Sequence, residues 1–380
     1  MRLSSLAIIM ALFAFNGIDM KGLESKYISR LDHLRFLAAS LVVFVHVYSA
    51  SGGYSGHSSS NFFLKFFLSG NTGVTLFLVI SGFIFTVITK AGAKEIDYKS
   101  FILNRIKRIA PLLIVALVIS ISLNRATVTF NDVMSMFFLS NMSESPLIKT
   151  FGPTWTIAIE TQFYLIVPFL LIFLNKNGIK YIISLSLFWV LIRALLILTY
   201  QNSLGAEPEV GHYSYLTMIG RFDQLLIGMI AGYLYLNYRH LFTSKILFII
   251  STVIVFIAIS RIYKLDAWNS LKPSSVLLTY FEALVWALFI LSYICVSIKL
   301  PDWLDNTLSK LGEVSYSQYI LHVLLIGFIN SYTGWLELVV DPKLNAIFNF
   351  LLFLPIVLIF SKLSYELIEK PFLQMRKKYI

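Results

Sequence analysis

WTIAIETQFYLIVPFLLIFL, residues 155–174, is a run of 20 residues with one charged side chain, Glu160. An α-helix rises about 1.5 Å per residue, so a run of this length crosses the roughly 30 Å hydrocarbon core of a bilayer. Comparable apolar windows lie at 31–50, 62–89, 109–123, 155–174, 179–200, 215–237, 244–262, 276–298, 313–335 and 345–367. We therefore predict an all-α integral membrane protein with about ten transmembrane helices.

The composition of the 380-residue chain points to the same class. Hydrophobic residues make up 57% and charged residues 13%, whereas soluble domains have about 45–50% apolar and about 25% charged residues. So apolar a chain is neither a soluble domain nor disordered. The single Cys295 excludes a disulfide framework and a cysteine-based metal site, and no metal site is predicted. The net charge of +11 is attributed to membrane orientation, and no nucleic-acid partner is expected.

Lys and Arg indicate the orientation, because cytoplasmic loops are enriched in them. With the N-terminus inside, 20 of the 31 fall in cytoplasmic segments, six in outer loops and five within spans. Both termini are therefore predicted to be cytoplasmic.

The chain reads as one membrane domain, residues 20–380. Residues 1–19 hold a short apolar stretch without a clear cleavage site, so they are interpreted as a signal-like segment or, preferably, as a mis-assigned start with Met20 as the natural one. Segment 130–142 is too short to span and is expected to lie in the membrane interface.

Ionisable residues within the spans form a predicted layer in the outer leaflet. His46 lies about 15 residues into an outward-running helix, and Glu160 about 6 residues into an inward-running one, so the two are expected at one depth. Intramembrane ionisable groups are functional candidates by default. His46 is a candidate general base, with Glu160 fixing its tautomer. Inert interhelical ion pairs are the alternative, which we favour for Arg193 and Glu282; Arg221 and Asp223 lie near the same depth.

A second layer is expected on the cytoplasmic side. Arg105 and Arg108 are three residues apart and share a helix face, which suits phosphates. Ordinary positive-inside charge is the alternative for this pair. Arg35, low in the first span, is expected to pair with one of the glutamates at 313, 366 or 369. Small residues in SGNTGVTLFLVISGF (69–83) indicate either close helix packing or backbone contact with a ligand.

At this point the chain resembles membrane-bound acyltransferase family 3, the bacterial group that O-acylates surface sugars. The resemblance runs from about Tyr27 to Phe372. It rests on seven segments in family order: LDHLRFLAASLVVFVH (31–46), TGVTLFLVISGF (72–83), NRIKRIAP (104–111), GPTWTIAIETQFY (152–164), RFDQLLIGMIAG (221–232), LGEVSYSQYILH (311–322) and YELIEKPF (365–372).

The resemblance implies transfer of an acyl group, usually acetyl, from cytoplasmic acetyl-CoA or another acyl-CoA to a sugar hydroxyl. Acyl-CoA is then a co-substrate, and no permanently bound cofactor is expected. Catalytic roles are implied for His46, the family's histidine, and for Arg35, the first-helix arginine. The remaining site residues implied or inferred are Glu160 as a catalytic group, Arg105, Arg108 and Lys107 for the donor, and Asn71, Arg221 and Asp223 for the substrate or oxyanion. Where the family often has paired acidic residues, this chain has Glu160-Thr161, so only Glu160 is carried over.

The implied partners are acyl-CoA, a glycan or lipid-linked sugar acceptor and the lipid bilayer, with glycan-assembly proteins or a second copy of the chain as further options. The implied location is the bacterial plasma (inner) membrane. Because the chain ends at Ile380, without the C-terminal extension of esterase-fused members, it is expected to act alone or with a separate partner. A transporter of an anionic solute and a glycan flippase are the rival interpretations. Release of CoA distinguishes the transferase from both.

Overall fold

A computed structural model describes residues 27–54, 61–123, 125–126, 128–130, 133, 154–204, 215–268 and 272–380. Residues 1–19, most of segment 130–142 and Gly152-Pro153 lie outside these ranges. Within them the chain is helical and has no strand. The elements are α2 (Ser29–Ala50), α3 (Phe62–Leu68), α4 (Asn71–Ile88), α5 (Tyr98–Leu123), α8 (Thr154–Asn177), α9 (Ile179–Leu204), α11 (Met218–Tyr238), η1 (Arg239–Phe242), α12 (Lys245–Lys264), α13 (Pro273–Cys295), α14 (Asp302–Glu313), α15 (Ser315–Phe328), η2 (Ile329–Thr333), α16 (Pro342–Ser364), η3 (Tyr365–Glu369) and α17 (Lys370–Gln374).

The predicted all-α membrane architecture is confirmed. In the described part of the chain, eight helices are long and apolar enough to cross a membrane. The two other predicted windows correspond to α11, which is interrupted by polar residues, and to α15, which continues as the π-helical η2. The count of ten spans and the side of each terminus stay predictions.

Two predicted windows have different bounds in the structure. The window 62–89 is broken at Ser69-Gly70, where α3 ends and α4 begins. The window 109–123 is part of a longer helix, α5, which starts at Tyr98 and carries the basic segment before Pro111 as helix. Arg105 and Arg108 therefore belong to a membrane-spanning helix.

Helices α4 and α11 are in backbone contact at the centre of the bundle. A Cβ on Gly82 would lie 2.0 Å from the backbone oxygen of Leu225, and one on Gly228 would lie 2.2 Å from that of Val79. On the other side of α4, a Cβ on Gly73 would lie 2.4 Å from the oxygen of Ala38 in α2. The glycines of α4 thus serve close helix packing, which was one of the two interpretations of this segment.

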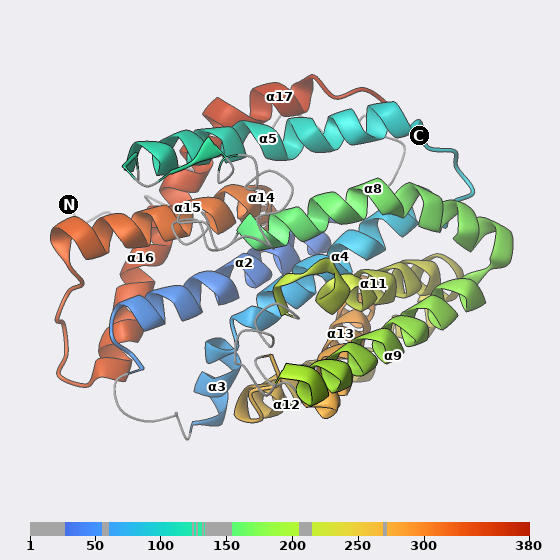
Figure 1. Ribbon diagram of the computed structural model, residues 1–380, viewed down its shortest axis with the longest axis horizontal. Coiled ribbons are helices and arrows are strands. Elements are labelled where there is room, and N and C mark those ends of the chain that lie inside the picture. Colours follow the sequence, from blue (N-terminus) through green and yellow to red (C-terminus); the bar gives the residue numbers. More distant parts are fainter. Residues whose placement is uncertain are drawn as a thin grey trace.

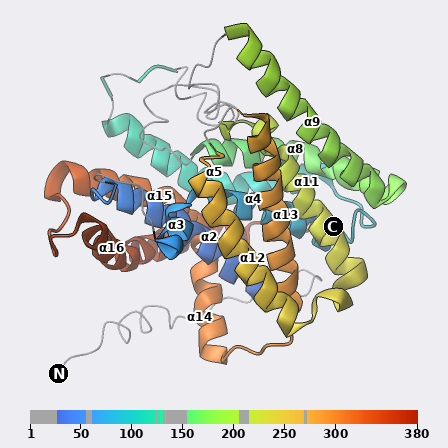
Figure 2. The ribbon, with the colours of Figure 1, turned by 90° about the horizontal axis from the view of Figure 1, so that it is seen from below.

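Figures 1 and 2 show α2, α4 and α11 in the interior, with α9 at one edge and α15 and α16 toward the opposite edge. The outer faces of the peripheral helices are apolar. On α12, for example, Ile246, Ile249, Val253 and Ile257 are exposed. An apolar face of this extent is a lipid-facing surface in a membrane protein.

Candidate active site

A cavity of about 100 Å³ lies among α2, α4, α5, α8 and α15. Its polar lining consists of Arg35, Ser81, Arg105, Arg108, Thr156, Glu160, Tyr164, Ser315, Tyr316 and Tyr319, and its apolar lining comes mainly from α4. At about 10–15 Å³ per water on the same measure, it has room for roughly ten small polar groups or waters. Three arginines and one carboxylate facing a cavity make it an anion-attracting site within the membrane domain.

Arg108 is the cation of this cavity that has no partner in the described residues. It makes no hydrogen bond or ion pair there, although the carboxylates of Glu160 and Glu369 act on it electrostatically. A guanidinium offers five N–H donors in a planar fork that matches phosphate or carboxylate oxygens. Arg108 is therefore available to a ligand anion.

Arg105 shares the helix face with Arg108, as the spacing predicted, but it is held differently. Its guanidinium lies 5.3–5.7 Å from the ring centroids of Phe85, Phe101, Tyr164 and Tyr379. It also donates to the hydroxyl of Tyr379 at 3.2 Å. This aromatic cage fixes the cation at the cavity wall through cation–π contacts.

Arg35 and Lys107 have partners that the sequence did not indicate. Arg35 pairs with Asp32, one helical turn earlier, at 3.1 Å, and not with any of the three glutamates expected, since a neighbour on the same face of α2 is closer. Lys107 donates its Nζ to the backbone oxygen of Met375 at 2.6 Å. Lys107 is absent from the cavity lining, so the structure does not place it at the predicted donor site.

Glu160 lies in this cavity, and the prediction that it adjoins His46 is wrong. Its carboxylate accepts from the hydroxyl of Ser81 at 3.3 Å and from that of Tyr164, and its charge acts on Arg35 and Arg108. His46 is not part of the lining. The depth estimate gave no direction around either helix: Glu160 faces Ser81 and Tyr164, whereas His46 faces His322.

His46 contacts a second histidine, on α15. Its Nδ1 lies 2.9 Å from Nε2 of His322, and the two rings stack with centroids 5.0 Å apart and 14° between planes. His322 is fully buried, and its Nδ1 lies 3.2 Å from the backbone oxygen of Gln318. His46 has an exposed side chain four residues before the end of α2.

The Gln318 carbonyl fixes the tautomers of both rings. A carbonyl only accepts, so Nδ1 of His322 carries the proton and donates. In the neutral ring, Nε2 of His322 is then an acceptor, and His46 donates its Nδ1 proton to it. The lone pair of a neutral His46 is consequently on Nε2, the nitrogen that does not face His322. This arrangement orients His46 as a proton acceptor.

Tyr319 connects the two parts of the site. It lines the cavity, its hydroxyl accepts from Thr156 at 2.9 Å, and its ring packs edge-on against Phe77. Its other neighbour is His322, one turn further along α15, with ring centroids 5.9 Å apart. The histidine pair therefore lies directly beyond the tyrosine wall of the arginine-lined cavity.

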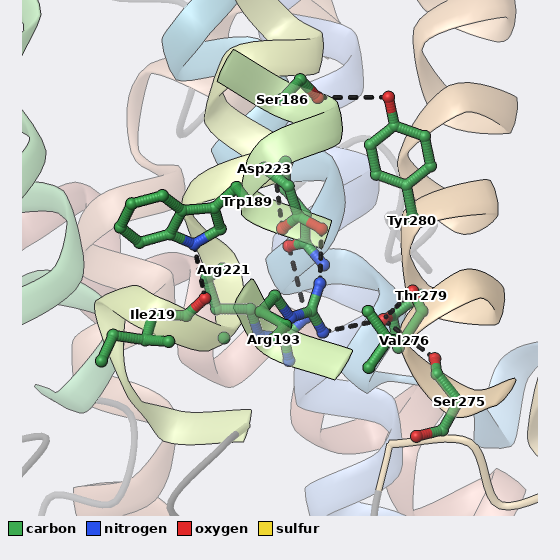
Figure 3. A network of polar contacts seen from close by, with 12 residues as sticks. Ser186, Trp189, Arg193, Ile219, Arg221, Asp223, Ser275, Val276, Thr279 and Tyr280 are labelled. Atoms are coloured by element: carbon green, nitrogen blue, oxygen red, sulfur yellow. Dashed lines mark hydrogen bonds and ion pairs between the residues drawn. The ribbon is translucent and has the colours of Figure 1, made fainter. Parts of the chain in front are cut away.

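Asp223 and Arg193 form a buried ion pair between helices, away from the cavity lining. Arg193 on α9 pairs with Asp223 on α11 and donates to the Thr279 hydroxyl on α13 at 3.0 Å (Figure 3). This is an interhelical ion pair of the kind favoured for Arg193. It neutralises the charge of Asp223, whose substrate role stays a prediction.

Arg221 is also buried away from the cavity, and its Nη2 has no hydrogen-bond partner in the described residues. It is 1% exposed, its Nε donates to the backbone oxygen of Tyr215 at 3.0 Å, and its guanidinium stacks 3.6 Å from the centroid of that ring. Glu282, also fully buried, accepts from Trp268 at 2.9 Å. Neither Arg221 nor Glu282 lines the cavity.

Asn71 begins α4 and is half-buried. The preceding residue, Gly70, packs on Val45, because a Cβ there would lie 2.3 Å from Val45 Cγ1. Since Val45 adjoins His46, Asn71 is at the level of the histidine pair. Its proposed contact with an oxyanion stays a prediction.

Sequence reasoning missed His322, Tyr319 and Tyr164. His322 and Tyr319 both lie in LGEVSYSQYILH (311–322), which was noted as a motif without a role for its histidine. A histidine within an apolar span was the available signal, since such residues are functional candidates by default.

The chain matches the family model described as an acyltransferase domain over residues 28–366. It is 24% identical over 383 residues to a Staphylococcus aureus (strain COL) protein named "Putative O-acetyltransferase", with 92% of this chain and 58% of that protein covered. A Bacillus subtilis (strain 168) protein named "Putative peptidoglycan O-acetyltransferase" is 28% identical over 228 residues, covering 53% and 32% respectively. The chain thus spans little more than half the length of the staphylococcal relative. No solved structure matches it.

Proposed function

The chain belongs to membrane-bound acyltransferase family 3, whose model it matches over residues 28–366, and we propose that it transfers an acyl group from acyl-CoA to a hydroxyl of a cell-surface glycan or of its lipid-linked precursor. Acetyl is the proposed acyl group, because the staphylococcal and Bacillus relatives are named as O-acetyltransferases. The bacterial plasma membrane is the proposed location.

The observation that carries this proposal is the adjacency of two chemically different parts. An arginine-lined cavity and a histidine pair meet at Tyr319, which contacts both. An acyl-CoA donor needs cationic contacts for its phosphates, and an alcohol acceptor needs a base for its proton. The site supplies both: the arginines of α2 and α5 line the cavity, and His46 of α2 meets His322 of α15 beyond Tyr319.

The cavity suits only part of the donor. A volume of about 100 Å³ has room for an acetyl group and the adjoining part of the pantetheine arm, and it is too small for the nucleotide. We assign the nucleotide phosphates to the arginine-rich end, with Arg108 as the main contact. Tyr319 would have to turn aside for the thioester to approach His46.

The proposed reaction is a direct transfer. Nε2 of His46 takes the proton of the acceptor hydroxyl as its oxygen attacks the thioester carbonyl carbon. The new C–O bond forms, the C–S bond breaks, and the CoA thiolate leaves and takes the proton back from His46. During this step Nε2 of His322 accepts a hydrogen bond from Nδ1–H of the charged His46 ring. A donor such as Asn71 stabilises the developing oxyanion.

A glycan acceptor is supported by the Bacillus relative, whose name specifies peptidoglycan. The test is release of free CoA thiol by the purified full chain in nanodiscs, given acetyl-CoA with and without a soluble peptidoglycan fragment or a lipid-linked sugar. Acceptor-dependent release, with an added acetyl mass on the acceptor, is expected. Uptake or flipping of the sugar without any CoA release would refute the proposal in favour of a transporter or flippase.

A further inference from the structure

The C-terminal segment 375–380 is fastened along α5 through backbone hydrogen bonds. The side-chain amide of Asn104 donates to the backbone oxygen of Lys377 at 2.6 Å and accepts from its N–H at 3.1 Å. Lys107 donates to the oxygen of Met375 at 2.6 Å, and the N–H of Asp97 donates to that of Tyr379 at 3.0 Å. Asn104 is 1% exposed. The segment is therefore held in one register on the basic part of α5.

This docking places Arg376 beside the two arginines of α5. Arg376 stands between two residues whose backbones are anchored to Lys107 and Asn104. Its Nε is buried and has no hydrogen-bond partner in the described structure. Burial and the positive charges of Arg108 and Arg105 lower the pKa of Arg376 to about 9. At pH 7 its guanidinium is still charged.

Three neighbouring guanidiniums, none of which forms an ion pair with a carboxylate in the described residues, indicate a site for an anion. The Nε of Arg105 is also buried without a hydrogen-bond partner in this part of the chain. Glu369, whose charge acts on both Arg376 and Arg108, accepts from the hydroxyl of Ser317 and forms no ion pair with either arginine. Because Arg108 has no hydrogen-bond partner either, all three members of the cluster have spare donors in the described structure.

We propose that Arg376 completes, with Arg105 and Arg108, a three-arginine site for the phosphates of a nucleotide-linked acyl donor, and that Asn104 and Lys107 are the positioning residues that hold Arg376 there. This rests on the proposed function, which supplies the polyanionic donor. It also explains why two polar residues of the NRIKR segment bond to the chain terminus and do not enter the cavity.

The test compares donor fragments on the full chain in nanodiscs, by calorimetry. The ligands are CoA, 3′-dephospho-CoA and S-acetylpantetheine, which carries no phosphate. Arg376→Ala should weaken CoA binding about 10- to 100-fold, since charge-assisted contacts are involved, and should change S-acetylpantetheine binding less than twofold. Arg376→Lys should retain part of the affinity, because an ammonium keeps the charge and loses the planar fork. Lys377→Ala, an exposed neighbour, is the matched control and should have little effect.

Asn104→Ala gives a second test that leaves every charge in place. Release of the segment should weaken CoA binding in the same direction, again without loss of S-acetylpantetheine. Unchanged CoA affinity in Arg376→Ala, or an equal loss in Lys377→Ala, would overturn the inference and leave the proposed function intact. Failure of the unsubstituted protein to bind CoA at all would instead refute the proposed function.

Discussion

Nδ1 of His46 lies 2.9 Å from Nε2 of His322, across the interface of α2 and α15. The two helices are tied a second time by Gln318, whose side-chain amide donates to the Ser40 hydroxyl at 3.4 Å, while its backbone oxygen accepts from His322. Gln318 therefore holds both the helix contact and the tautomer of the histidine that faces His46. A base oriented this way needs no carboxylate partner.

His322→Ala should lower kcat about 10- to 100-fold, the effect of one hydrogen bond to a group that becomes charged. KM for acyl-CoA should stay unchanged, because His322 lies outside the cavity lining. His322→Gln should recover part of the rate, since its amide oxygen can accept from Nδ1 of His46. Steady-state kinetics would measure both. The matched control is His33→Gln, because His33 is a buried histidine at the opposite end of α2, bonded to Tyr293; an equal rate loss there would reduce His322 to a packing role.

His46→Ala should lower acyl transfer about 10²- to 10⁴-fold through loss of the general base. The protein should remain folded, because the His46 side chain is exposed and its loss leaves only the buried Nε2 of His322 to be solvated. Acceptor acylation by mass spectrometry, with size-exclusion profiles in detergent, would measure the two effects. Acylation close to the unsubstituted level would remove His46 from the chemistry.

The sequence predicted what depends on spacing along one helix. The apolar windows matched helices, and the three-residue spacing put Arg105 and Arg108 on one face. Contacts between side chains of different helices could not be predicted from the sequence. Counting residues from a membrane face gives a depth but no direction around the helix, so Glu160 and His46 were paired although Glu160 faces Ser81.

The aromatic cage of Arg105 shows the same limit. Its four rings come from α4, α5, α8 and the C-terminal segment, and no local pattern links them. Glycine packing was easier to anticipate, because small residues in an apolar run have few structural uses. The choice between helix contact and ligand contact for Gly82 still required the position of Leu225.

Arg108→Ala and Arg105→Ala should separate into different defects. Arg108→Ala should weaken CoA binding about 10- to 100-fold with little change in thermal stability, because Arg108 has no hydrogen-bond partner to lose. Arg105→Ala should also lower the melting temperature, since it empties a cage of four rings. Calorimetry with CoA and thermal unfolding would be compared. Identical affinities in both variants and the unsubstituted protein would leave these arginines as determinants of topology.

Asp223→Asn should destabilise the protein by about 3–5 kcal/mol, because it strands the buried Arg193 charge. Adding Arg193→Gln should restore much of that stability. Transfer activity per folded molecule should be close to normal in the double variant, because this pair lies outside the cavity lining. Thermal unfolding and normalised activity would test this. A stable double variant without activity would restore a substrate role to Asp223.

Glu160→Gln should affect the donor cavity and not the base. The carboxylate offsets the charges of Arg35 and Arg108, so its neutralisation should leave CoA affinity equal or a few-fold higher. The free energy of unfolding should fall by about 1–3 kcal/mol, because the arginine charges would lose the carboxylate that offsets them. Adding Arg108→Gln to Glu160→Gln should recover this stability and lose CoA affinity. A double-mutant cycle should then give a coupling energy of about 0.5–3 kcal/mol.

Ser81→Ala, which removes a neutral contact to the same carboxylate, is the matched control and should cost less. Loss of transfer in Glu160→Gln with normal CoA binding and normal stability would contradict this account and return Glu160 to the catalytic step.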